Sequence, residues 1–100
     1  MLVAFSISPS AGDAAGGVSE AVAAAIRVVR ESGLACETNA MFTNIEGEWD
    51  EVMAVVKQAV DVVAASSPRV GLVLKADIRP SRTDQLTAKV ERIEERLTDR

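Results

Sequence analysis

The stretch ACETNAMFTNIEG, residues 35–47, decides the fold because it holds two extended segments in direct succession. Side chains alternate between two faces over residues 35–42, which predicts a strand. Residues 43–46 continue extended up to Gly47, which predicts a short strand after a tight bend or bulge. Two strands in a row at this point predict a hairpin in the middle of the chain. By alternation, one face of the first strand carries Glu37, Asn39 and Met41.

On each side of the hairpin the sequence predicts one helix and one strand. Apolar residues recur at helical spacing over residues 18–32 and 49–65, while residues 2–8 and 70–78 alternate as strands do. A last helix is predicted over residues 83–97. Its apolar residues form a narrow stripe, typical of a helix that pairs with another helix: Leu86, Val90, Ile93 and Leu97.

The resulting order of elements is β-α-β-β-α-β followed by a helix, which is the split βαβ arrangement. We therefore expect an α+β, ferredoxin-like βαββαβ sandwich, in which a four-stranded antiparallel sheet carries two helices on one face, plus a C-terminal helix. The length of 100 residues corresponds to one domain, residues 1–100. With 48% hydrophobic but only 3% aromatic residues, its core must be aliphatic.

Charge and residue usage narrow the functional classes. A formal charge of −4 makes nucleic acid an unexpected partner and mildly favours a cationic ligand. The absence of His and Tyr removes the commonest general base and transition-metal ligand, so we expect no metal, no cofactor and no catalysis. The lone Cys36 and the lack of a signal peptide or an apolar span of ~20 residues predict a cytoplasmic protein without membrane contact.

The face of the sheet away from the two helices is a candidate ligand site. It combines hydroxyls, an amide, carboxylates, an ammonium and a thioether, a mixture suited to a small polar ligand. A plain solvated face and a face that pairs two subunits are the alternatives. The side chains that alternation places there include Ser6, Ser8, Glu37, Asn39, Met41, Val73, Lys75 and Asp77.

Two other features favour structural roles. The glycine-rich segment 12–17 precedes a helix but lacks the Lys-Ser/Thr of a phosphate-binding loop, so we expect a flexible turn. Trp49 is expected to be a core or interface anchor.

The segment ETNAMFTNIEGEW at residues 37–49, together with VAFSISP at residues 3–9, resembles the thiamine-binding protein family. Leu74, Lys75 and residues 77–79 extend the resemblance, which covers about residues 1–97. It implies a ferredoxin-like fold, dimers that pair their sheets, often tetramers, and binding of thiamine or its hydroxymethylpyrimidine half without catalysis. Position 39 is Asn where some relatives have Thr, which leaves open whether the ligand is thiamine, its phosphate or the precursor.

From the residues and the resemblance together, we assign provisional roles in a thiamine pocket on the open face, at a subunit interface. The pyrimidine edge is assigned to Glu37, Asn39 and Thr43, and the pocket floor to Ser6, Ser8 and Lys75. Met41 is assigned to an apolar wall, whereas Glu46 belongs either to the pocket or to the turn beside Gly47. The alternatives are a small α+β isomerase or hydrolase that uses carboxylates, and an oligomeric regulatory module. A homodimer or homotetramer is expected, since a thin core leaves apolar surface uncovered.

Overall fold

The structure is a computed structural model that describes residues 1–10, 19–80 and 83–98. The predicted turn at 12–17 lies outside these residues. Seven elements follow the predicted order, each within a few residues of its predicted bounds except the second strand. They are β1 (Leu2–Pro9), α1 (Ser19–Glu31), β2 (Ala35–Thr38), β3 (Thr43–Glu46), α2 (Trp49–Ala64), β4 (Val70–Asp77) and α3 (Gln85–Thr98).

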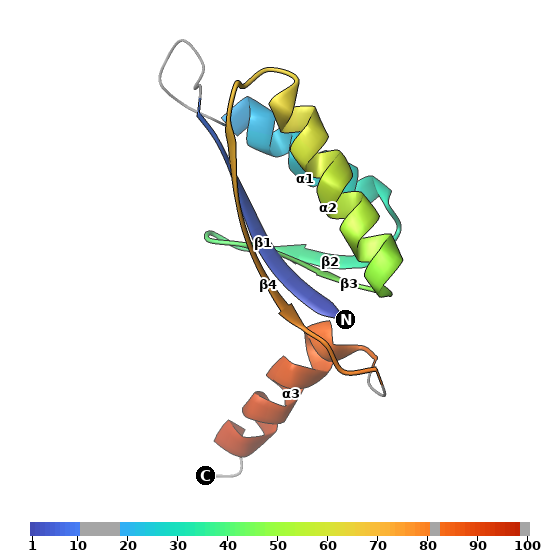
Figure 1. Cartoon of the computed structure of the whole chain (residues 1–100). Coiled ribbons are helices and arrows are strands. Elements are labelled where there is room, and N and C mark those ends of the chain that lie inside the picture. The colour runs from blue at the N-terminus through green and yellow to red at the C-terminus, as the bar shows by residue number, and fades with distance from the viewer. Residues whose placement is uncertain (11–18, 81–82, 99–100) are drawn as a thin grey trace.

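The four strands form one antiparallel sheet in the order β2-β3-β1-β4, so the first and third strands lie in the centre. Helices α1 and α2 lie side by side over one face of the sheet, and α3 extends away from this two-layer body (Figure 1). The predicted ferredoxin-like α+β fold is therefore confirmed. None of the described helices is both long and apolar enough to cross a bilayer.

The core lies between the central strands and the two helices. Val3 and Phe5 of β1 and Ile45 of β3 are almost fully buried against α1 and α2. Because strand side chains alternate, the odd-numbered residues of β1 face the helices and the even-numbered ones face the open side. The helices contribute mainly valine and alanine to the core: Ala25, Val29, Val52, Val55, Val56, Ala59 and Val63.

Strand β2 ends at Thr38, so the predicted strand over residues 35–42 is wrong in its second half. Residues 39–42 form the hairpin turn instead, in which the Asn39 N–H donates to the Phe42 carbonyl oxygen at 2.9 Å. The side-chain Oδ1 of Asn39 also accepts from the backbone N–H groups of Met41 and Phe42, at 2.9 Å each. An asparagine that bonds to the backbone two or three residues ahead favours a turn over a strand.

Helix α3 is attached to the sheet by charged side chains. The carboxylate of Glu46, at the end of β3, accepts from the backbone N–H of Gln85 at 2.8 Å and of Leu86 at 3.0 Å. These are two of the N–H groups that a helix N-terminus leaves without internal partners. Lys89 also donates to Asp77 of β4, and this hydrogen bond lowers the pKa of Asp77 below its ordinary value.

The outer elements are less buried than the sequence suggested. Trp49 opens α2 with 54% of its surface exposed, so it is not a core residue. Strand β4 pairs only with β1, and its predicted helix-facing residue Leu72 is 44% exposed. Burial on this sheet is therefore concentrated over the two central strands.

The Glu46 cap gives a first test. Glu46→Gln keeps one acceptor oxygen for two N–H groups, so α3 should loosen by about 1 kcal/mol. Amide hydrogen exchange should then be about fivefold faster in the first turns of α3 and unchanged in β1. Glu37→Gln, which alters an exposed carboxylate on the neighbouring strand, should leave α3 unaffected. Equal exchange in all three proteins would contradict the anchoring role.

Candidate ligand-binding site

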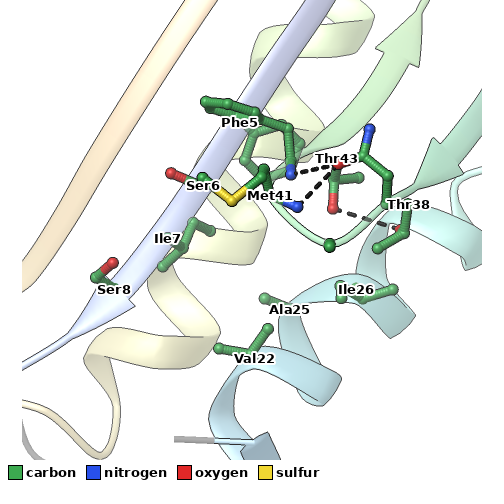
Figure 2. Close-up of a pocket in the computed structure, with 13 residues that line it drawn as sticks. Phe5, Ser6, Ile7, Ser8, Val22, Ala25, Ile26, Thr38, Met41 and Thr43 are labelled. Carbon is green, nitrogen blue, oxygen red and sulfur yellow. Dashed lines mark hydrogen bonds between the residues drawn. The ribbon is translucent and has the colours of Figure 1, made fainter.

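A cavity of about 300 Å³ opens where the β2–β3 hairpin, strand β1 and helix α1 meet. It is lined by residues 5–8 of β1, residues 38–43 of the hairpin, and Val22, Ala25 and Ile26 of α1 (Figure 2). This volume is at the lower end of the range of roughly 300–1,000 Å³ for small-molecule pockets. The cavity therefore suits one ring system better than a large ligand.

The cavity exists because the paired strands differ in length. Strand β1 has eight residues and pairs with β4 along all of them, whereas β3 has four. The β1–β3 ladder ends at the pair Phe5–Thr43, and the chain then turns away through residues 39–42. The second half of β1 is thus left beside a notch that α1 closes from the helix side.

The lining is apolar with a few neutral polar groups. Phe5, Ile7 and the α1 residues supply hydrocarbon, and the hydroxyls of Thr38 and Thr43 lie 3.4 Å apart at one end. Among the described residues that line the cavity, none has an ionisable side chain. An uncharged polar molecule with a flat apolar body is the kind of ligand that such a lining favours.

Five of the eight predicted site residues border this cavity, namely Ser6, Ser8, Asn39, Met41 and Thr43. The cavity lies on the helix side of the sheet, however, and not on the open face where the pocket was predicted. Alternation failed beyond Thr38, because the turn at 39–42 carries Asn39 and Met41 out of the strand. Thr43 is 7% exposed and faces the helices with Phe5, its partner in the ladder.

The five differ in what their side chains can offer a ligand. The side-chain Oδ1 of Asn39 already accepts two backbone hydrogen bonds within the turn, and Met41 is 74% exposed at the rim of the cavity. Ser6 and Ser8 project to the other side of β1 from Ile7, so they border the cavity without pointing into it (Figure 2). Thr43 is the one residue of these five that is buried.

The three charged candidates lie elsewhere. Glu37 is exposed on β2 opposite Asn44, and Lys75 is exposed on β4 opposite Ala4, both on the open face. Glu46 bonds to the backbone N–H groups at the start of α3. This is a structural role, as one of the two alternatives for Glu46 expected, although the bonds go to α3 and not to the turn beside Gly47. Within the ranges that the structure describes, no three potential metal ligands come together.

Pattern analysis missed the α1 wall (Val22, Ala25 and Ile26), Thr38 and Ile7. All five are on faces that alternation or helical spacing assigns to the core. The signal that could have found them is the mismatch in strand length, since a β1 of eight residues outruns a hairpin strand of four. Exact strand ends are the least reliable part of a prediction from sequence.

The fold and the cavity together define a small ferredoxin-like α+β protein with a cavity whose described lining residues are uncharged. Comparisons with known proteins agree with this fold. The sequence profile of the family described as thiamine-binding protein matches residues 3–94, so the chain belongs to the thiamine-binding protein family.

Three similar proteins each cover nine-tenths or more of this chain. UPF0045 protein Mb1933 of Mycobacterium bovis is 56% identical over 99 residues, which is 97% of this chain and 94% of the relative. The crystal structure of MJ1052 from Methanocaldococcus jannaschii superposes with a TM-score of 0.83 at 35% identity, covering 94% of this chain and 95% of that one. TM0486 of Thermotoga maritima, provisionally named for thiamine biosynthesis or salvage, shares the fold with a TM-score of 0.74 at 23% identity, covering 90% and 96%.

The role of Asn39 in the turn can be separated from a role in binding. Asn39→Ala removes the acceptor of two backbone N–H groups and should lower the free energy of unfolding by about 1 kcal/mol. Asn39→Asp keeps the acceptor and should restore most of that loss. Chemical denaturation of the three ligand-free proteins measures this directly, and equal midpoints would contradict the turn role.

Proposed function

We propose that this protein binds thiamine or its hydroxymethylpyrimidine precursor without transforming it, and that the pyrimidine ring occupies the cavity between β1, α1 and the hairpin turn. The observation that carries the proposal is the uncharged, ring-sized cavity in a chain of the thiamine-binding protein family. The Thr38 and Thr43 hydroxyls at its end supply neutral donors and acceptors for the ring substituents.

The chemistry of the lining favours the pyrimidine half of thiamine over the thiazolium half. A thiazolium is a cation, and burying it among the described lining residues would leave its charge without a carboxylate partner. The pyrimidine is neutral and meets no such cost. We therefore place the thiazolium outside the cavity, next to a protein whose net charge of −4 attracts it weakly. A phosphate tail would gain nothing from the described lining residues, none of which is cationic.

Binding is favoured over catalysis for a related reason. General acid–base chemistry needs a titratable group within hydrogen-bond reach of the substrate. The described lining residues offer hydroxyls, an amide, a thioether and hydrocarbon, and none of these groups acts as a general acid or base near neutral pH. The carboxylates on which an isomerase or hydrolase would depend, Glu37 and Glu46, lie away from the cavity.

Calorimetry with hydroxymethylpyrimidine, thiamine and thiamine diphosphate tests the proposal. The first two should bind with similar affinity, and the diphosphate should bind no more tightly. Thr43→Val should weaken binding about fivefold, through the loss of one neutral hydrogen bond. Glu37→Ala is the matched control and should bind as the unaltered protein does.

Two results would overturn the proposal. One is the absence of binding by any of the three compounds. The other is conversion of thiamine on prolonged incubation with the protein, which mass spectrometry of the recovered ligand would detect.

We further propose that the protein is a homodimer or homotetramer of the reducing cytoplasm, where its single, half-buried Cys36 stays a thiol. Val90, Ile93 and Leu97 lie on one side of α3 and are each more than half exposed, and α3 stands away from the body of the fold (Figure 1). Strand β4 is an edge strand whose Leu72 and Val73 are also exposed. A second copy of the chain would cover such apolar surface.

Sedimentation velocity tests the association. The unaltered protein should sediment as a dimer or tetramer at micromolar concentration, and Ile93→Glu should shift it toward the monomer. Glu94→Gln, which keeps the size of an exposed side chain at the adjacent position, should leave the sedimentation unchanged. A monomer in the unaltered protein would contradict the association and leave the binding proposal intact.

A further inference from the structure

The backbone of Ile7 is placed where the β1–β3 ladder has already ended. At the start of that ladder, Met1 and Gly47 exchange both of their backbone bonds, from the Met1 amine to the Gly47 oxygen at 2.9 Å and from the Gly47 N–H to the Met1 oxygen at 3.1 Å. In an antiparallel pair such exchanges occur at every second residue. The odd-numbered residues of β1 therefore direct their N–H and C=O groups toward β3.

The other edge of β1 gives an independent check. Just past the end of the strand, the N–H of Ser10 donates to the Arg69 carbonyl oxygen at 3.0 Å, so it is the even-numbered residues that bond toward β4. Ile7 lies opposite Leu72 in that ladder as a pair without mutual hydrogen bonds. Both backbone groups of Ile7 thus point away from β4 and toward the notch.

None of the described residues forms a hydrogen bond with the Ile7 N–H or C=O on the notch side. The β3 ladder stops at Phe5, two residues earlier, and no backbone or side-chain partner is recorded for the Ile7 N–H or C=O across the notch. Ile7 itself lines the cavity and is half-buried, so water reaches these groups only in part. A half-buried backbone donor and acceptor without protein partners gain from any ligand that pairs with both.

We propose that the N–H and C=O of Ile7 recognise the ligand, as an adjacent donor and acceptor that pair with a planar ring bearing an acceptor nitrogen next to an amino group. The ring lies in the plane of the sheet, in the place of the residues that a longer β3 would have put there. Its ring nitrogen accepts from the Ile7 N–H, and its amino group donates to the Ile7 carbonyl oxygen. This inference rests on the proposed function and names the edge of the ring that the protein binds.

An aminopyrimidine carries this pair of groups side by side, and the thiazolium ring of thiamine does not. Recognition through the backbone also explains how a cavity whose described lining residues are all uncharged can select among rings. The selection comes from a fixed donor and acceptor on a central strand, which no side-chain movement can rearrange. A ring without the amino group leaves the Ile7 oxygen unpaired and should bind about tenfold more weakly.

The NMR signals of isoleucine amides test the Ile7 hydrogen bond directly, because the chain has only five isoleucines and their spectrum is simple. Three of the five are used here. In protein labelled with ¹⁵N-isoleucine, the Ile7 amide should exchange rapidly with solvent when free. It should shift downfield and exchange about tenfold more slowly at saturating 4-amino-5-hydroxymethyl-2-methylpyrimidine. Ile45, paired with Val3 in the ladder, and Ile93, on α3, are internal controls and should not change.

A pair of variants tests the donor separately. Ile7→Pro removes the N–H without breaking a bond to β4, and Ile7→Val keeps the N–H with a similar side chain. The proline variant should bind the same pyrimidine about tenfold more weakly than the valine variant. If the proline variant fails to fold, the amide measurement on the unaltered chain still decides the matter.

Each outcome has a defined meaning. A pyrimidine that binds by calorimetry and leaves the Ile7 amide unshifted overturns this inference and leaves the proposed function standing. An Ile7 amide that is as protected as Ile45 in the free protein overturns it as well. A pyrimidine that does not bind at all overturns both.

Discussion

The pairing of a long central strand with a short one is the constraint on which this structure depends. Strand β1 bonds to β4 along eight residues and to β3 along four, and the Asn39 turn ends the shorter ladder. Had the hairpin continued to the end of β1, its backbone would fill the notch. The pocket is therefore a consequence of where one asparagine folds the chain back.

The two ends of the β2–β3 hairpin have different structural roles. At the turn end, residues 38–43 wall the cavity, and at the other end Glu46 holds the first turn of α3. Charge follows this division, since the carboxylates and the ammonium of the open face lie on the side of the sheet away from the cavity. The carboxylate of Glu46 therefore acts on α3, while the described residues that line the cavity are uncharged.

The separation of charge from the cavity defines the kind of ligand that the proposed site would favour. Side chains of α1 and β1 offer hydrocarbon against which a flat ring would pack, and the threonines and the backbone offer polar contacts. Binding at such a site would gain little from ionic attraction and would depend little on salt.

The sequence by itself determined the order of elements, the aliphatic core and the faces of β1, because alternation and helical spacing are local properties that each segment expresses alone. Of the site residues that it proposed, Thr43, Asn39 and Met41 border the cavity. Only the tertiary structure decided which side of the sheet holds the pocket. That depended on the end of β2, where a side-chain bond from Asn39 overrides a strand pattern that runs on to Phe42, and on the register that leaves Ile7 without a partner strand. Glu46 likewise required the fold, since its partners lie about forty residues away and no local pattern links a strand end to a distant helix.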